Sequence, residues 1–331
     1  MVKVAIVGAT GVVGSKMIEM FEQYEIAADE LVLFSSPRSA GKEVEVQGQM
    51  YTVRELTEEA AKEGFDYVIM SAGGGTSKHF APLFEEGGAI VIDNSSQWRM
   101  HEDIDLIVPE INRPVLDRRI IANPNCSTIQ SVVALQPLKE KFGLKRVHYT
   151  TYQAVSGSGV GGLRDLEEGA KGEAPTTYPH PIHDNVLPHI DVFQEDGYTK
   201  EERKMIDETQ KILSQPDLAV TATCVRVPVT NSHAVQINVT LDKEATVEEV
   251  REAFKGIPHI KLVDNPENNE YPTPLDSTGK SEVFVGRIRK DESLENTFHI
   301  WCTADNLLKG AAQNTVQILK MMMETESVQN G

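Results

Sequence analysis

The sequence has few cysteines, no long apolar run, and fewer basic than acidic side chains. Three cysteines cannot build a disulfide framework and are typical of a reducing compartment. With 32 basic against 50 acidic residues, the net charge of −18 argues against general affinity for nucleic acid or anionic membranes. No stretch of about twenty apolar residues is present to cross a membrane. These features predict a soluble cytoplasmic protein without a nucleic-acid or membrane partner.

The length and the changing pattern of the chain predict two domains. At 331 residues the chain exceeds the usual size of one hydrophobic core. Its first part alternates short apolar strands with helical segments, which is typical of a doubly wound parallel sheet in the α/β class. From Val147 the strands are longer and rich in β-branched residues, with helices predicted at about 160–170, 200–213 and 246–254. This second pattern predicts an α+β domain with a mixed sheet, and places the boundary near residue 127.

A glycine-rich loop, "VGATGVVG", joins the first predicted strand to the first predicted helix. Gly8, Gly11 and Gly14 follow a GxxGxxG spacing, which differs from the GxGxxG fingerprint of dinucleotide-binding loops. Such a loop can cradle a pyrophosphate with its amides and the helix N-terminus, although glycines also serve a tight strand-to-helix turn. Its place after the first strand favours a nucleotide.

The end of the second predicted strand indicates which dinucleotide would bind. An Asp or Glu here would select NAD, but the sequence has Ser35, Ser36, Arg38 and Ser39. Hydroxyl groups and a guanidinium suit a 2′-phosphate, so NADP is favoured over NAD. The alternative is a solvated loop arginine.

Cys126 lies in "NPNCST", directly before a run that reads as a helix. The positive end of a helix dipole stabilises a thiolate, which makes this cysteine a candidate nucleophile. Cys224 and Cys302 lie inside strand-like runs and are interpreted as small buried hydrophobic residues.

A cysteine nucleophile needs a proton-transfer partner, and nine histidines are available. His180, His183 and His189 share a proline-rich loop, but no cysteine or acidic ligand pattern accompanies them, so no metal site is predicted. His233 follows Arg226 by seven residues across a turn, which could bring an imidazole and a carboxylate-binding fork to one cleft. On spacing alone, a surface histidine is narrowly favoured.

Seven motifs carry a family resemblance, and they occur in one order along the chain: "GATGVVG", "SSPRSAG", "DNSSQWRM", "VPEIN", "NPNCST", "TYQAVSGSG" and "RVPVTNSH". In this order they resemble the aspartate-semialdehyde dehydrogenase family, and the match runs to the final "ADNLLKGAAQN". The resemblance implies a Rossmann-type NADP-binding domain of residues 1–127 and 308–331, completed by the terminal helix. Residues 128–307 would form the catalytic and dimerisation domain of a homodimer, which could pair into a tetramer.

The resemblance also implies a reaction. The family catalyses the reversible reductive dephosphorylation of L-4-aspartyl phosphate by NADPH, which gives L-aspartate 4-semialdehyde and phosphate. The product leads to lysine, by way of diaminopimelate, and to threonine and methionine. The Cys126 thiolate would attack the acyl phosphate, and the resulting thioester would accept hydride more readily than a carboxylate does.

The remaining site residues are implied by the same resemblance. His233 would be the acid–base partner of Cys126, and Gln153 would orient the acyl group. Arg226 would bind the substrate α-carboxylate, and Glu201 the α-ammonium group, with Glu201 chosen over Glu202 by the pattern E-x-x-K. The phosphate would meet Lys204, Arg99 and Asn125. The implied cofactor-binding residues are Gly8, Thr10, Gly11, Val12, Val13, Gly14, Ser35, Ser36, Arg38, Ser39, Ser156, Gly157, Pro181 and Asn306.

Three other readings compete with this one. N-acetyl-γ-glutamyl-phosphate reductase shares the chemistry on a substrate one methylene longer, but Arg226 and Glu201 favour a free amino-acid head group. Glyceraldehyde-3-phosphate dehydrogenase carries its cysteine in an "SCTTN"-like context that is absent here. A non-catalytic NADP-sensing protein would need the glycine loop but not Cys126 or His233.

Overall fold

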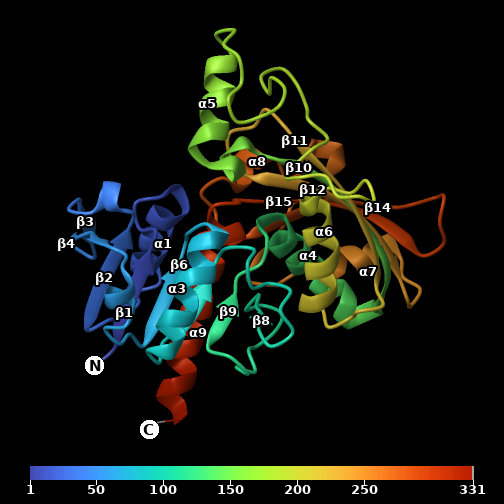
Figure 1. The fold of residues 1–331 in the computed structure, drawn as a ribbon. Coiled ribbons are helices and arrows are strands. Elements are labelled where there is room, and N and C mark those ends of the chain that lie inside the picture. The colour runs from blue at the N-terminus through green and yellow to red at the C-terminus, as the bar shows by residue number, and fades with distance from the viewer. Residues whose placement is uncertain (330–331) are drawn as a thin grey trace. The chain divides into compact units, whose positions relative to one another are not determined.

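The computed structural model describes residues 1–329, and side chains as far as residue 325. It divides the chain into two compact units (Figure 1). Unit 1 comprises Met1–Pro124 and the chain from Ala311 onward, and unit 2 comprises Asn125–Gly310. Of the helices in the described part, none has the length and apolar character needed to cross a membrane.

Unit 1 contains a seven-stranded sheet in which every pairing is parallel, as predicted. Its order is β5-β2-β1-β6-β7-β9-β8. The first strand, β1, therefore lies inside the sheet, with β2 on one side and β6 on the other. Its strands are β1 (Lys3–Val7), β2 (Glu30–Ser35), β5 (Arg54–Glu55), β6 (Tyr67–Met70), β7 (Ile90–Asp93), β8 (Asp105–Leu106) and β9 (Ile120–Ala122). The helices are α1 (Val12–Gln23), α2 (Glu58–Ala61), α3 (Gly74–Glu86) and α9 (Gln313–Gln329), and a hairpin of β3 (Glu43–Val46) and β4 (Gln49–Thr52) stands apart from the sheet.

The pairing of β1 decides where unit 1 can bind a ligand. Val7, the last residue of β1, pairs with Phe34 of β2 on one side and with Met70 of β6 on the other. The three loops that follow these strands therefore begin at the same edge of the sheet. In open α/β sheets this is the edge, at the switch in strand order, where ligands bind.

Unit 2 contains a six-stranded mixed sheet in the order β11-β10-β12-β15-β14-β13, which confirms the predicted second architecture. β10 pairs parallel with β11, and β13 with β14, whereas the remaining neighbours are antiparallel. The strands are β10 (Leu144–Gln153), β11 (Ala219–Arg226), β12 (His233–Leu241), β13 (Ile260–Leu262), β14 (Val283–Lys290) and β15 (Thr297–Ala304). The helices are α4 (Cys126–Phe142), α5 (Gly159–Gly169), α6 (Lys200–Ile212), α7 (Val247–Glu252) and α8 (Pro274–Ser277).

The two faces of this mixed sheet differ. Helices α4 and α6 pack on one face, where the Tyr149 hydroxyl lies 3.1 Å from the Thr209 hydroxyl of α6. Helix α4 is buried along almost all of its length, and it contacts both the sheet and α6. The opposite face keeps polar and aromatic side chains partly exposed, among them Tyr152, Gln236 and Trp301.

Candidate active site

Cys126 is the first residue of α4, at the position that its sequence context predicts. Asn125 caps the helix, because its side-chain Oδ1 accepts hydrogen bonds from the backbone N–H groups of Ser127 (3.1 Å) and Thr128 (3.2 Å). A Cβ on Gly310 would lie 2.8 Å from the Cβ of Cys126, so only glycine fits beside the cysteine. The half-buried Cys126 thus lies at the positive end of a seventeen-residue helix, which favours its thiolate.

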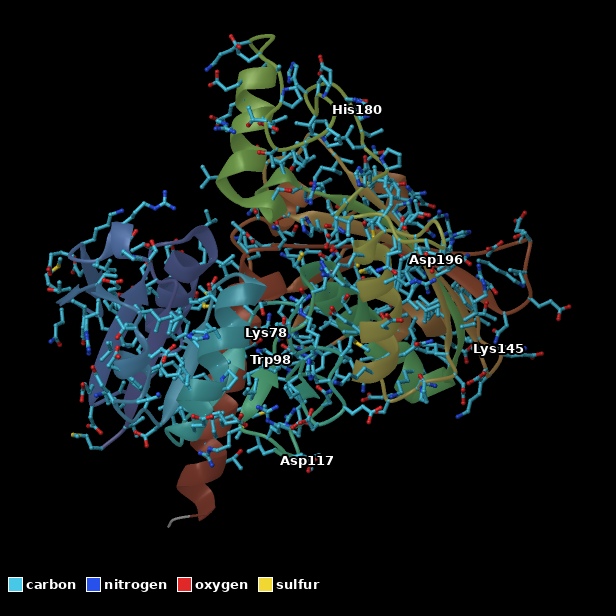
Figure 2. The ribbon with its side chains drawn as sticks, in the orientation of Figure 1. Lys78, Trp98, Asp117, Lys145, His180 and Asp196 are labelled. Atoms are coloured by element: carbon cyan, nitrogen blue, oxygen red, sulfur yellow. The ribbon has the colours of Figure 1, made fainter. Side chains whose placement is uncertain are left out.

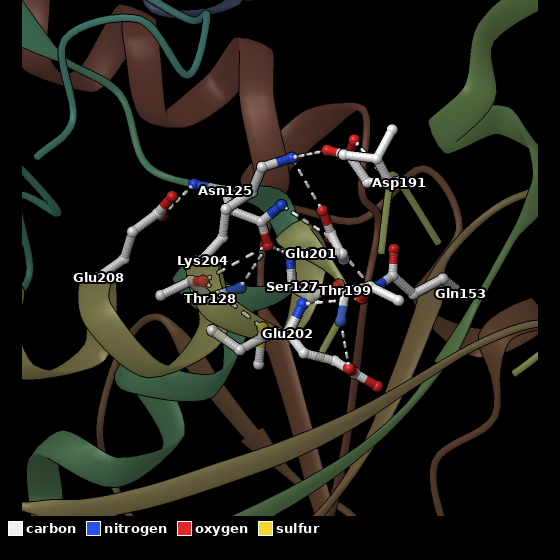
Figure 3. A network of polar contacts seen from close by, with 12 residues as sticks. Asn125, Ser127, Thr128, Gln153, Asp191, Thr199, Glu201, Glu202, Lys204 and Glu208 are labelled. Atoms are coloured by element: carbon white, nitrogen blue, oxygen red, sulfur yellow. Dashed lines mark hydrogen bonds and ion pairs between the residues drawn. The ribbon is translucent and has the colours of Figure 1, made fainter. Parts of the chain in front are cut away.

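Two glutamates of α6 hold the residue before the cysteine (Figure 3). The Asn125 side-chain amide donates to Glu201 over 2.8 Å, and the Asn125 backbone N–H donates to Glu208 over 2.7 Å. Glu201 and Glu208 are seven residues apart, two helical turns, and so lie on one face of α6. Helix α6 therefore fixes the start of helix α4.

Glu201 is the centre of a buried polar network (Figure 3). One carboxylate oxygen accepts from Asn125 and from the Gln153 amide at 3.3 Å, and the other accepts from Lys204 at 3.1 Å. Burial acts to raise the pKa of Glu201, but Lys204, the Asn125 hydrogen bond and Arg226 outweigh it, so the pKa is lowered. The carboxylate is charged at neutral pH.

The neighbours of Glu201 on α6 have different tasks. Lys204 donates both to Glu201 and to Asp191 (2.8 Å), so its ammonium lies between two carboxylates. Glu202 instead completes the capping box of α6 with Thr199, and it also accepts the Cys224 backbone N–H. Glu201 therefore faces Asn125 and Gln153, whereas Glu202 serves the helix end.

Strand pairing brings Gln153 and Arg226 together. They are the last residues of β10 and β11, and they are register partners in a parallel pair. The buried Arg226 donates from one terminal nitrogen to the Ala154 carbonyl over 2.7 Å, while its Nε has no hydrogen-bond partner among the described residues. The guanidinium has donors to spare for a ligand.

His233 is the first residue of β12 and is fully buried. Its Nδ1 accepts a 3.0 Å hydrogen bond from the Ala154 backbone N–H, so the proton of the neutral ring resides on Nε2. Nε2 has no partner among the described residues. Burial, with the nearby Arg226 charge, holds the pKa of His233 well below its usual range. The imidazole is therefore a neutral Nε2–H donor.

Gln130 was not predicted, although it joins the cysteine helix to the histidine. It lies one turn after Cys126 on α4 and is buried, and its side-chain amide donates to the His233 carbonyl over 3.2 Å. A glutamine four positions after Cys126, on the same face of the predicted helix, was the available signal.

The segment after β10 packs against both Arg226 and His233. A Cβ on Gly157 would lie 3.0 Å from an Arg226 terminal nitrogen and 3.4 Å from the His233 Nε2, so glycine permits this approach. Beside it, the Ser156 hydroxyl donates to the side-chain oxygen of Asn231 and accepts a hydrogen bond from the side-chain amide of Asn306. These contacts place Gly157, Ser156 and Asn306 in one cluster.

Unit 1 has a pocket at the position of the predicted nucleotide site. A pocket of about 390 Å³ opens where the loops after β1, β2 and β6 meet, lined by Val7, Gly8, Thr10, Gly11, Ser35, Ser36, Pro37, Leu56, Ser71, Ala72, Thr76 and Phe80. Gly8 has a positive φ of 80°, and a Cβ there would lie 2.0 Å from the Ser71 carbonyl oxygen. A Cβ on Gly14 would lie 2.0 Å from the Gly8 carbonyl oxygen. The loop is thus a cradle that requires these glycines.

The other predicted residues of unit 1 lie beside or away from this pocket. Arg38 and Ser39 belong to a short 3₁₀ turn, Pro37–Ser39, directly after the lining residue Ser36, and Arg38 is exposed. Val12 and Val13 begin α1, after the loop. The buried Arg99 donates to the backbone carbonyls of Asn123 (2.9 Å) and Asn94 (3.0 Å).

The histidine loop after α5 does not form a metal-binding group. His180 is exposed (Figure 2). Nε2 of His183 lies 3.5 Å from the carboxylate oxygen Oδ2 of Asp184, and the ring of His189 stacks on that of Phe193. Among the side chains that the structure describes, residues 1–325, no three His, Cys, Asp or Glu are grouped to hold a metal. Pro181, in the same loop, is exposed.

Comparison with known proteins adds to this geometry. Residues 3–119 match the family model "Semialdehyde dehydrogenase, NAD binding domain", and residues 135–309 match "Semialdehyde dehydrogenase, dimerisation domain". An aspartate-semialdehyde dehydrogenase of Aquifex aeolicus is 49% identical over 333 residues, covering 97% of this chain and 98% of that protein. The chain belongs to the aspartate-semialdehyde dehydrogenase family.

Solved structures of the aspartate-semialdehyde dehydrogenase family share the fold. The aspartate semialdehyde dehydrogenase II of Vibrio cholerae complexed with ASA aligns with a TM-score of 0.93 at 40% identity, over 98% of this chain and 99% of that one. The Candida albicans aspartate semialdehyde dehydrogenase with NADP aligns with a TM-score of 0.75 at 27% identity, over 98% and 99% of the two chains. Unit 1 of this family member is therefore a Rossmann-type, NAD(P)-binding domain.

Proposed function

We propose that the protein is an NADP-dependent aspartate-semialdehyde dehydrogenase that carries the acyl group on Cys126. The grouping in unit 2 supports this most directly: the thiol lies at a helix N-terminus, and the Asn125 that caps this helix shares a polar network with Glu201, Lys204 and Gln153. Arg226 ends the strand beside Gln153. A thiolate, a carboxylate and two cations suit a substrate with an ammonium group, a carboxylate and a phosphate.

The chemistry proposed for Cys126 has two stages in the biosynthetic direction. The thiolate attacks the carbonyl carbon of L-4-aspartyl phosphate, a C–S bond forms, and the C–O bond to phosphate breaks. The resulting thioester is reduced, and the C–S bond then breaks to return the thiolate and release L-aspartate 4-semialdehyde. The helix dipole stabilises the thiolate both as nucleophile and as leaving group.

His233 and Gln153 are proposed to act on the oxygen of the acyl group. Nε2 of His233 carries the only ring proton, so the neutral imidazole can share it with the oxyanion of the thiohemiacetal through a hydrogen bond and keeps it when the C–S bond breaks. Gln153 is held by Glu201 and Thr151, which leaves its amide in one orientation toward the acyl group.

Substrate recognition is proposed to use the charged side chains of the site. The guanidinium of Arg226 matches the geometry of the α-carboxylate, and the ionised Glu201 matches the α-ammonium group. Lys204, Asn125 and Arg99 are proposed to receive the phosphate. An acetylated amine, as in N-acetyl-γ-glutamyl phosphate, carries no positive charge to pair with the buried Glu201 carboxylate, which disfavours the longer, acetylated substrate.

The glycine cradle and its surroundings are proposed to hold NADP. Gly8, Thr10, Gly11 and Gly14 would take the pyrophosphate at the start of α1, and Ser35, Ser36, Arg38 and Ser39 the ribose 2′-phosphate. When bound, NADPH supplies the hydride that reduces the thioester. Ser156, Gly157, Asn306 and Pro181 are proposed to complete the site. We infer that residues 1–127 and 308–331 act as the cofactor-binding domain, and residues 128–307 as the catalytic and dimerisation domain.

Replacing Arg38 with alanine is expected to lower the preference for NADP over NAD. A charge-assisted hydrogen bond contributes about 1.5–3 kcal/mol, so the ratio of kcat/KM for the two cofactors should fall by ~10- to 150-fold. The measurement is initial rate with each cofactor, with Arg113→Ala as control, because Arg113 is an exposed arginine of the same unit. An unchanged preference in the Arg38 variant would refute the assignment.

The exposed face of the mixed sheet is proposed to be the interface of a homodimer. Tyr152 and Trp301 pack there with ring centroids 5.4 Å apart, and neither is buried. Aromatic residues are enriched at protein interfaces. The matching family model also carries the description of a dimerisation domain. Light scattering should report twice the chain mass, and a Trp301→Glu variant of one chain mass would locate the interface.

One assay tests the proposed function. NADPH formation is followed at 340 nm from NADP, L-aspartate semialdehyde and phosphate, beside a mixture that lacks phosphate. Phosphate-dependent turnover is the expected result. Turnover with N-acetylglutamate semialdehyde alone would assign the protein to the longer, acetylated substrate, and NADP binding without any turnover would favour a sensor.

A further inference from the structure

The ring of Tyr178 is an aromatic neighbour of the Arg226 guanidinium. The guanidinium carbon lies 5.9 Å from the centre of the Tyr178 ring, within the range of a cation–π contact. Tyr178 belongs to the loop between α5 and α6, which also carries His180, His183 and His189. Tyr178 belongs neither to the histidines considered as a metal site nor to the residues proposed to bind the cofactor.

The ring of Tyr178 is held from the side of the hydrophobic core. It packs against a buried cluster of Val155, Ile182 and Leu187, together with Leu163 and Leu166 of α5. Its hydroxyl is buried and has no hydrogen-bond partner among the described residues. The hydroxyl therefore does not fix the position of the ring, whereas the apolar cluster and Arg226 do.

The backbone of Tyr178 is held by a buried carboxylate of α5. Asp165 accepts hydrogen bonds from three successive backbone N–H groups, those of Thr176 (3.0 Å), Thr177 (2.7 Å) and Tyr178 (3.0 Å), and from the Thr176 hydroxyl. Burial acts to raise the pKa of Asp165, but these donors outweigh it and lower the pKa to about 2. Asp165 thus stays charged across the working pH range and keeps the loop attached to α5.

Arg226 needs such support, because its other contacts leave the plane of its fork undetermined. The structure records one side-chain hydrogen bond for it, to the Ala154 carbonyl, and its Nε is unpaired among the described residues. A guanidinium recognises a carboxylate only when its plane is correctly oriented, and stacking on an aromatic face restricts that plane. The ring of Tyr178 offers such a face.

We propose that Tyr178 is a positioning residue for substrate recognition: its ring orients the Arg226 guanidinium toward the substrate α-carboxylate, and Asp165 holds Tyr178 in place. The inference rests on the proposed role of Arg226 in binding that carboxylate. Tyr178 acts through Arg226 and takes no part in the bond changes at Cys126. Its effect should therefore fall on KM for L-aspartate semialdehyde and not on kcat.

The test compares Tyr178→Leu and Tyr178→Phe with the wild-type enzyme in the phosphate-dependent assay. Tyr178→Leu should raise KM for L-aspartate semialdehyde by about 5- to 30-fold, the loss expected for a partly desolvated cation–π contact, with kcat within threefold. Tyr178→Phe should keep KM within twofold, because it retains the ring and loses only an unpaired hydroxyl. Asp165→Asn has one acceptor oxygen in place of two, so its KM should lie between those of the wild type and Tyr178→Leu.

A matched control is provided by Tyr24, a half-buried tyrosine of unit 1 whose ring lies 5.8 Å from the Lys320 ammonium. Tyr24→Leu should leave KM unchanged. An unchanged KM in Tyr178→Leu, a loss confined to kcat, or a Tyr178→Phe variant as impaired as Tyr178→Leu would each overturn the inference. If Tyr178→Leu fails to fold, the other two variants still decide, because an unchanged KM is expected for Tyr178→Phe and a raised KM for Asp165→Asn. Absence of turnover in the wild type would instead refute the proposed function and the inference with it.

Discussion

Replacing Cys126 with alanine is expected to abolish turnover while leaving NADP affinity nearly unchanged. Without the thiol no thioester forms, and the two-stage route is lost. The cofactor site proposed in unit 1 does not include this residue. The measurement pairs the 340 nm assay with a fluorescence titration of NADP. Loss of NADP binding in the variant would indicate a structural cysteine.

The other two cysteines supply the control for that experiment. Both are fully buried in strands. Burial raises the pKa of the Cys302 thiol to about 12 and also raises the pKa of the Cys224 thiol. Neither thiol is ionised at neutral pH. Cys224→Ala should therefore retain turnover, and brief treatment with iodoacetamide should label Cys126 alone, as mass spectrometry of the peptides would show. Equal labelling of all three would contradict the assignment.

Replacing His233 with alanine is expected to lower kcat by ~10²- to 10⁴-fold, the usual contribution of a positioned proton donor. His233→Gln should recover part of the loss, because a glutamine amide can also donate an N–H to the acyl oxygen. The measurement is kcat under saturating substrate, with circular dichroism to verify folding. A rate within twofold of wild type in the alanine variant would remove His233 from the mechanism.

The pH dependence of wild-type kcat provides a second reading on His233. Its pKa lies well below the ordinary value of 6.5, so the imidazole stays neutral as the pH falls through 6.5 and is protonated only at lower pH. The kcat profile should therefore have no inflection near pH 6.5 that depends on this residue. Such an inflection, present in the wild type and absent in His233→Gln, would show that the ring titrates normally.

Much of the fold follows from local patterns in the sequence. The alternation of strands and helices predicted the parallel sheet, and the β-branched runs predicted the mixed sheet, because periodicity and residue type report burial directly. Short elements were harder to predict. The apolar run "DLIVPEI" forms only the two-residue strand β8. The β3–β4 hairpin was missed, although its first strand, "EVEV", alternates polar and apolar residues.

The site shows what a single sequence leaves undetermined. Cys126 was recognisable, because a helix entrance and a nucleophile have local signatures. Glu208, Gln130 and Tyr178 were missed, because each acts through a partner between 48 and 103 positions away, and no local spacing records such a contact. The tautomer of His233 likewise depends on a hydrogen bond from the backbone N–H of Ala154, the residue directly after β10.

The position of Glu201 restricts how this active site can change. One carboxylate is bound to Asn125, which caps the cysteine helix, and is also proposed to recognise the substrate ammonium group. A substitution that adapted the site to an uncharged head group would also release the cap beneath the nucleophile. Compensating changes at Asn125 or Gln153 would have to accompany it, since contacting residues do not respond independently. Divergence toward a new head group is therefore expected to require several coordinated substitutions in this network, so that no single replacement provides a gradual route to new specificity.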